Sequence, residues 1–332
     1  MATPTLERAA ERLAALLGAP GTGLRDPSEH SANLIFEAEA VPRPLERLTA
    51  PADAWAVDGG QALVADARCL QVLVTRASRV RFQGGRCVTE DEGELRAHLL
   101  GGADERVAAV EALDLDGIAA DTSVDVNLLR DRWEWEAVRQ CVEEADRGAL
   151  VLVDGDLQPD WRIPSSFLGD LLRRAAERGV VLAGITKHSS LARGGAPLLG
   201  LLELEAAEAL GPRAMWWAPV ARTRTSARTD TGAGLQVVAA RLDPDARFAF
   251  RIDLPAGADA AATLGRLAAL CDDAAFPGYP YPLTVADRLA ACPGWLRSEA
   301  WLQLDELLAR AGLSAEVRDR AFTDRHRLME RS

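Results

Sequence analysis

The chain has 332 residues, of which 48% are hydrophobic and 27% are charged, a composition typical of a folded globular protein. At about 150 residues per domain, this length corresponds to two domains or one large one. No run approaches the roughly 18 consecutive apolar residues of a membrane span, and the N-terminus carries acidic residues where a signal peptide is basic and then apolar. We therefore expect a cytoplasmic protein that does not enter a membrane.

The cysteines and basic residues exclude several kinds of site. Five scattered cysteines form no Cys-x-x-Cys pair, which argues against a disulfide framework and a thiolate zinc site. The net charge of −12 disfavours a protein that coats nucleic acid, although it is compatible with a local DNA channel. Lys187 is the only lysine, and its neighbours do not fit the phosphate-binding loop of P-loop NTPases.

The N-terminal part is predicted to form an extension followed by a meander of strands. Apolar residues at helical spacing predict a helix over 6–17, which ends at a glycine-rich turn. Residues 24–50 are polar and rich in proline, so we expect an irregular connection around a short helix. Three successive strands, which indicate an antiparallel meander, are expected at 54–60, 70–82 and 86–89.

Helices and buried strands alternate in the middle of the chain. Two continuous apolar runs are typical of strands buried on both faces. The helix before the first of them is predicted to be closed by Gly148 as its C-terminal cap. This order predicts a mixed α/β sheet flanked by helices. The helices are expected at 91–113, 127–147 and 167–178, and the strands at 149–155 and 180–186.

The last third of the chain is predicted to add further elements to the same unit. No internal repeat or low-complexity linker separates it, so we expect one elaborated unit and not two separate domains. Helices are expected at 202–210, 260–271 and 283–292, followed by two more, and strands at 215–220, 235–242 and 248–254.

Two predicted strands each end in the same Val-Asp-Gly sequence, with the aspartates at Asp58 and Asp154. On neighbouring strands these carboxylates would lie a few ångströms apart, where like charges resist joint ionisation unless a cation lies between them. Oxygen ligands suit magnesium or manganese better than zinc. Asp-Gly is also a common turn dipeptide. Its repetition at the ends of buried strands favours a metal site.

Five short motifs follow one another in order along the chain. They are Ala-Val-Asp-Gly-Gly at 56–60, Leu-Val-Asp-Gly-Asp-Leu at 152–157, Gly-Ile-Thr-Lys at 184–187, Arg-Ile-Asp at 251–253 and Gly-Tyr-Pro-Tyr-Pro-Leu at 278–283. Each motif is short, but the ordered set, which spans about residues 50–292, resembles the NurA nuclease family.

This resemblance implies a ribonuclease-H-like α/β fold and a manganese-dependent nuclease with endonuclease and exonuclease activity on DNA. It also implies a homodimer that works with the hexameric HerA DNA translocase in end resection during double-strand break repair. The corresponding division of the chain is an N-terminal helical extension at 1–50, a nuclease domain at 51–292, and C-terminal helices at 293–332 packed on the same unit.

Carried onto this sequence, the resemblance implies that Asp58 and Asp154 hold metal together with a glutamate from the preceding helix. Glu134 and Glu136 are both candidates. Helical spacing places Glu134 on an apolar face with Val138, whereas Glu136 falls toward solvent, which favours Glu134. The spacing to Asp154 in the family suits Glu136 better, so both stay open.

The resemblance assigns the last metal ligand to a late helix, where Asp287 stands in place of the histidine of many relatives. A carboxylate can also bind magnesium or manganese. Lys187 is expected at the same sheet edge as the aspartates, where it can hold the scissile phosphate or neutralise its developing charge. Two Mn²⁺ or Mg²⁺ ions at this site would perform two-metal phosphodiester hydrolysis.

Further residues are candidates for DNA contacts. His188 follows Lys187 and can face the same site. The only two tyrosines lie in a Tyr-Pro repeat, which can contact DNA or simply form a rigid turn. Three arginines interleaved with threonine and serine can contact phosphates or form a solvated turn. The candidates in these two segments are Tyr279, Tyr281, Arg222, Arg224 and Arg228.

Two other functions stay open at this level. A catalytically silent adaptor of the same fold would bind only DNA or the translocase, and the departure at Asp287 keeps this alternative open. An actin-like or sugar-kinase-like ATPase also places Asp-Gly loops against phosphates. That alternative predicts a glycine-rich nucleotide loop in each half of the chain, and the second half lacks a convincing one.

Overall fold

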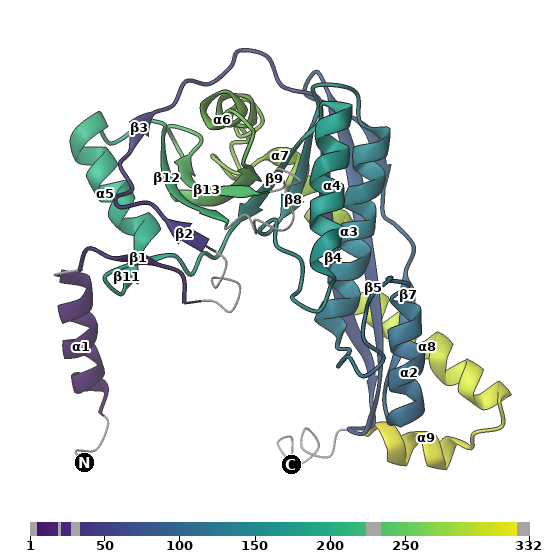
Figure 1. Ribbon diagram of the computed structural model, residues 1–332. Coiled ribbons are helices and arrows are strands. Elements are labelled where there is room, and N and C mark those ends of the chain that lie inside the picture. The colour runs from purple at the N-terminus through teal and green to yellow at the C-terminus, as the bar shows by residue number, and fades with distance from the viewer. Residues whose placement is uncertain (1–4, 19–20, 28–33, 224–233, 324–332) are drawn as a thin grey trace.

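The computed structural model describes residues 5–18, 21–27, 34–223 and 234–323, and one large mixed sheet dominates it (Figure 1). The strands lie in the order β2-β12-β13-β14-β9-β8-β4-β5-β6, and β3 and β7 pair at the sides with β12 and β5. Their bounds are β2 (Leu34–Phe36), β3 (Arg43–Pro44), β4 (Ala54–Asp66), β5 (Leu70–Gln83), β6 (Arg86–Asp91), β7 (Arg96–Gly101), β8 (Leu150–Asp154), β9 (Val181–Thr186), β12 (Trp216–Thr223), β13 (Leu235–Arg241) and β14 (Phe250–Pro255). A small separate sheet contains β1 (Leu24–Arg25), β10 (Ala192–Arg193) and β11 (Ala196–Pro197).

The centre of the sheet follows the predicted order of strands. β4, β5 and β6 form an antiparallel meander, and β8 and β9 then run parallel to β4 on its other side. Parallel neighbours need a crossover connection, and α3 (Val126–Glu144) and α4 (Ser165–Arg178) lie in those connections. The prediction of a ribonuclease-H-like mixed sheet flanked by helices is confirmed.

Helices cover both faces of the sheet because its strands are apolar on both faces. On β4, Trp55 and Val57 pack with α3 and α4, whereas the alternate residues Ala54 and Ala56 face the other side. That other side is covered by α6 (Ala260–Ala268) and α7 (Tyr281–Ala290). Farther along the sheet, α5 (Leu198–Leu210) covers β12 and β13.

The β4–β5 hairpin, with β7 paired along the far half of β5, extends well beyond the other strands (Figure 1). Around its far end lie α2 (Ala103–Ala112), α8 (Gly294–Arg310) and α9 (Ala315–Phe322), and both α8 and α9 contact β4. At the opposite end of the molecule lies α1 (Leu6–Gly18). Neither α1, α8 nor α9 has a buried residue. No helix within the described residues is long and apolar enough to span a membrane.

Two stretches differ from the sequence predictions because they pair with distant strands. In place of a short helix, the described part of 24–50 contains β1, β2 and β3, of which β2 and β3 join the main sheet through β12. Residues 91–113 are not one helix, since β7 pairs with β5 before α2 begins. Pairing across the chain overrides local propensity at both places.

The C-terminal end of α3 is also earlier than predicted. The helix ends at Glu144, and its cap is Ala145 and not Gly148. Arg178, at the end of α4, donates hydrogen bonds to the carbonyls of Val142 (2.7 Å) and Ala145 (3.3 Å). An arginine from a neighbouring helix thus satisfies carbonyls that a helix end leaves without partners.

Candidate active site

Two neighbouring parallel strands bring Asp58 and Asp154 together. Val57 of β4 is in register with Val153 of β8, so the aspartate that follows each valine reaches the same edge. A third carboxylate, Asp287, comes from α7 on the covering layer. Asp58, Asp154 and Asp287 each offer an oxygen, and these oxygens all lie within 4.8 Å of one another. We call these three residues the acidic triad.

The prediction that the first strand ends with its Val-Asp-Gly sequence, at about residue 60, is wrong. β4 continues to Asp66 because it stays paired with β5, and Gly59 and Gly60 remain in the strand. A Cβ on Gly59 would lie 2.6 Å from Glu134 Oε2, and one on Gly60 would lie 1.8 Å from the carbonyl oxygen of Ala290. The two glycines therefore let α3 and α7 approach β4 beside the triad, and they do not form a turn.

Lys187 lies between two members of the triad. Its Nζ donates to Asp154 Oδ2 at 2.6 Å and to Asp287 Oδ1 at 3.3 Å. The same ammonium lies 5.0 Å from the ring centroid of the buried Tyr279. Lys187 follows the end of β9, so the strand after Asp154 places this cation at the triad.

The structure distinguishes the two glutamate candidates. Glu134 is buried, and its carboxylate lies against Gly59, next to Asp58. Glu136 lies away from the triad in ion pairs with Arg132 (3.1 Å) and Arg139 (2.5 Å). Burial opposes ionisation of Glu136, but hydrogen bonds from these arginines lower its pKa. Of the two glutamates, Glu134 is therefore the one that lies beside the triad.

Burial and the neighbouring carboxylates shift the pKa values of the residues at the site. Burial first, and then the charges of Asp154 and Asp287, raise the pKa of Asp58 to about 7. Burial and the charge of Asp58 likewise raise the pKa of Glu134 well above its usual range. Burial alone would lower the pKa of Lys187, but its hydrogen bond to Asp154 and the nearby charges raise it. Lys187 therefore stays a cation, whereas Asp58 gains or loses its proton near neutral pH.

The donor set fits a hard divalent cation. The converging atoms are all carboxylate oxygens, which magnesium and manganese prefer. After burial, the charges of Asp154 and Asp287 also raise the pKa of Asp58, and the single ammonium of Lys187 lowers it only in part. A further cation at Asp58 would relieve that repulsion.

The fold of this chain is similar to that of a solved nuclease structure. No protein-family model and no curated protein matches the chain. The crystal structure of the NurA nuclease from Sulfolobus solfataricus superposes with a TM-score of 0.54 at 13% identity, covering 82% of this chain and 88% of that one. The chain has a NurA-like fold. The resemblance predicted from the five motifs is confirmed at the level of the fold.

Two other solved structures superpose on the chain with lower TM-scores. A second NurA structure has a TM-score of 0.48 at 9% identity and covers 84% of this chain and 92% of that one. The catalytic domain of human endonuclease V has a TM-score of 0.38 at 15% identity and covers 94% of this chain and 100% of that one.

The candidate DNA contacts are spread over the NurA-like fold. Tyr279 lies at the triad, where burial and the charge of Asp154 raise its pKa, so its hydroxyl keeps its proton. Tyr281 instead packs edge to face on Phe82 of β5, with ring centroids 5.1 Å apart. His188 is exposed directly after Lys187.

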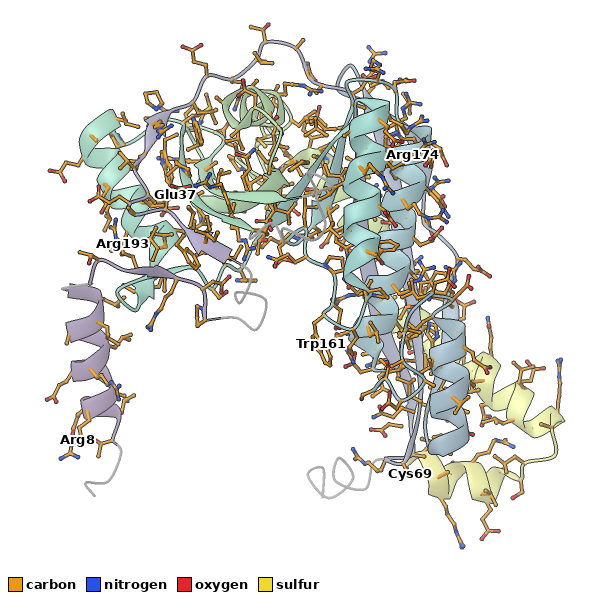
Figure 2. All side chains as sticks on the ribbon, in the orientation of Figure 1. Arg8, Glu37, Cys69, Trp161, Arg174 and Arg193 are labelled. Atoms are coloured by element: carbon orange, nitrogen blue, oxygen red, sulfur yellow. The ribbon has the colours of Figure 1, made fainter. Side chains whose placement is uncertain are left out.

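The predicted arginine loop is mostly outside the described residues, since it includes Arg224 and Arg228. Arg222, at the end of β12, pairs with Glu37 at 3.2 Å. Figure 2 shows Glu37 at the α5 end of the molecule, far along the sheet from α3 and α4. The structure therefore does not bring Arg222 to the acidic triad.

A buried ionic network on β14, which has no role assigned from the sequence, holds the loop after Asp154. Arg251 contacts Asp253 (2.9 Å) and Asp26 (3.1 Å), and the three side chains are at most 3% exposed. Asp253 also accepts a hydrogen bond from the backbone N–H of Leu157, in the loop that follows Asp154. The network thus holds that loop and a distant N-terminal residue on β14. The Arg-Ile-Asp motif was the available signal, because two opposite charges alternate within an apolar strand.

The raised pKa of Asp58 predicts a stability change. Since the folded-state pKa of about 7 exceeds the usual 3.8, the cost of ionising Asp58 in the fold appears above pH 4 and is complete above pH 7. We expect Asp58→Asn to raise the melting temperature of the metal-free protein at pH 8 by at least about 2 °C, and by less at pH 5. Differential scanning fluorimetry measures this change. The exposed Asp319→Asn is the control, and an equal gain at both pH values would contradict the argument.

Proposed function

We propose that this protein is a metal-dependent deoxyribonuclease that hydrolyses phosphodiester bonds. The observation that carries the proposal is the convergence of the acidic triad with Lys187 at one edge of a ribonuclease-H-like sheet. This set combines oxygen ligands for a hard cation with a fixed positive charge for a phosphate. The likeness of the fold to a NurA nuclease supports it.

Each residue has a distinct part in the proposed reaction. Asp58, Asp154, Asp287 and Glu134 would hold two Mn²⁺ or Mg²⁺ ions, which when bound supply a nucleophilic water and charge for the leaving oxygen. Lys187 binds a non-bridging phosphate oxygen and offsets its charge. The protonated hydroxyl of Tyr279 is available to donate a hydrogen bond toward the same phosphate.

Digestion of end-labelled single-stranded and double-stranded DNA by the purified protein tests this function. Separate reactions contain manganese, magnesium or EDTA. We expect cleavage with manganese or magnesium and none with EDTA. No cleavage in any metal, including with a HerA-type translocase added, would favour a catalytically silent adaptor.

Lys187 provides a more specific prediction. Because Lys187 supplies the fixed positive charge beside Asp154, Lys187→Met should lower the single-turnover cleavage rate by about 100-fold or more, which is the typical cost of removing one charge-stabilising donor. His188→Ala, in the adjacent exposed position, is the control and should cost less. Equal rates for the Lys187→Met variant and the wild type would remove Lys187 from the mechanism.

The cellular setting of this proposal rests on the family resemblance. It comprises a cytoplasmic homodimer, a HerA-type hexameric translocase as partner, and DNA end resection in double-strand break repair. Co-purification of the chain with the translocase encoded in the same genome, followed by a resection assay on linear duplex DNA, tests this setting. Absence of both a complex and a stimulation of cleavage would contradict it.

A further inference from the structure

A large groove leads away from the acidic triad. It has a volume of about 1160 Å³, and Lys187 and Asp287 line one end of it. The wall continues from Tyr279 to Phe250, whose rings lie 5.6 Å apart, and then to Phe248. The groove exceeds the roughly 300–1,000 Å³ of most small-molecule sites. We call it the aromatic groove.

Two loops from different parts of the chain form the walls of the aromatic groove. One connects β13 to β14 and carries Phe248, and the other connects α6 to α7 and carries Phe276. The loops meet at Gly278, which has a φ of +90° and where a Cβ would lie 2.5 Å from the Cβ of Ala246. A glycine is therefore required for this close approach, which sets the two phenylalanines on one groove.

Two phenylalanines at the groove are largely exposed, although phenylalanine is usually buried in a monomeric protein. Phe248 is 67% exposed and Phe276 is 58% exposed, and both line the groove. Single exposed apolar residues need no explanation, but here two aromatic rings line one groove that also includes Lys187, the proposed phosphate-binding residue. Flat exposed rings are suited to stacking on planar ligands.

The aromatic groove carries two arginines that can contact the phosphates of a ligand. Arg247 lines it and forms no ion pair with a described residue, and Arg288 lies 4.0 Å from Glu90. Three carboxylates also line the groove: Asp245 pairs with Arg213 at 2.6 Å, Asp287 pairs with Lys187 at 3.3 Å, and Asp273 accepts a hydrogen bond from the backbone N–H of Ala275. The two arginines and the two exposed rings can thus contact the phosphates and the bases of one ligand.

We propose that the aromatic groove binds an unpaired nucleic-acid strand next to the acidic triad, with Phe248 and Phe276 stacking on its bases and Arg247 and Arg288 contacting its phosphates. Stacking needs bases whose faces are open, so a duplex cannot use these rings. This inference rests on the proposed function and deepens it, because it makes an unpaired strand the preferred substrate of the same site.

Binding measurements test the groove separately from cleavage. Fluorescence anisotropy in EDTA, where metal-dependent hydrolysis cannot occur, compares a labelled oligothymidylate with a blunt duplex of equal length. Phe248→Ala and Phe276→Ala should each weaken oligothymidylate binding by about fivefold or more, as expected for loss of one base–aromatic stack, and should leave duplex binding within about twofold. Phe276→Trp should retain binding.

The control variants distinguish a loss of stacking in the groove from misfolding or a change in assembly. Trp295→Ala removes an aromatic side chain of similar exposure (66%) that does not line the groove, and it should bind both DNAs as the wild type does. Melting curves and size-exclusion chromatography check that the variants fold and keep their oligomeric state. Unchanged oligothymidylate binding, or a change in oligomeric state instead, overturns the proposal. Groove-dependent binding by a protein that never cleaves DNA would uphold the groove and refute the nuclease.

Discussion

Replacement of Asp154 by asparagine is expected to abolish metal-dependent DNA cleavage. Asp154 follows the last valine of β8, lies in the acidic triad and accepts a hydrogen bond from Lys187 at 2.6 Å. Asparagine keeps the shape of the side chain but removes the charge that a divalent cation needs. The cleavage rate should fall by more than about 100-fold, since even residues that only orient a metal ligand cost about 10–100-fold.

The matched glutamate pair on α3 makes this test more specific. Glu134 lies beside Gly59 and the triad, whereas Glu136 lies in ion pairs with Arg132 and Arg139. Glu134→Gln should lose cleavage to an extent similar to Asp154→Asn, and Glu136→Gln should retain it. Single-turnover rates at saturating manganese, with manganese affinity measured by calorimetry, decide the question. The reverse result would show that the buried glutamate is structural and would remove it from the proposed metal site.

Replacement of Arg251 by methionine should cause a large loss of stability. Arg251 is 2% exposed and pairs with Asp253 and Asp26, which are also buried. Methionine fills a similar volume but removes one partner of a buried ion pair with Asp253, which typically costs about 3–5 kcal/mol. Urea denaturation at pH 8 measures this loss in the free energy of unfolding.

The loss should also depend on pH. Burial already raises the pKa of Asp253, and the charge of Arg251 opposes that rise. Without Arg251 the folded state holds a proton on Asp253 more strongly than the unfolded chain does, so the variant loses stability as the pH rises from about 4. The deficit should therefore be smaller at pH 5 than at pH 8. Arg213→Met breaks the exposed pair with Asp245 and should cost under about 1 kcal/mol at either pH; equal costs for the two variants would contradict the buried-network argument.

Local sequence patterns predicted the central strands of the sheet and the two aspartates, Asp58 and Asp154, on them. The apolar runs of β8 and β9 and the alternation in β5 identify strands directly, because a buried strand must be apolar on each face that it buries. The Val-Asp sequence at Asp58 and Asp154 places both carboxylates on such strands. The length of β4 was missed, because Gly59 and Gly60 look like a turn when no partner is known.

The amino-acid sequence by itself determined the order of the central elements, the aspartates on them, the single lysine after β9 and the likeness to NurA. Each of these depends on short motifs of neighbouring residues and on the order of those motifs along the chain. Only the tertiary structure decided that Glu134 and not Glu136 reaches the triad, that Asp287 and Lys187 meet across 100 residues, and that two distant loops form one aromatic groove. These features depend on which helix face packs on the sheet and on where β4 and its neighbours align, which long-range packing sets and local spacing does not.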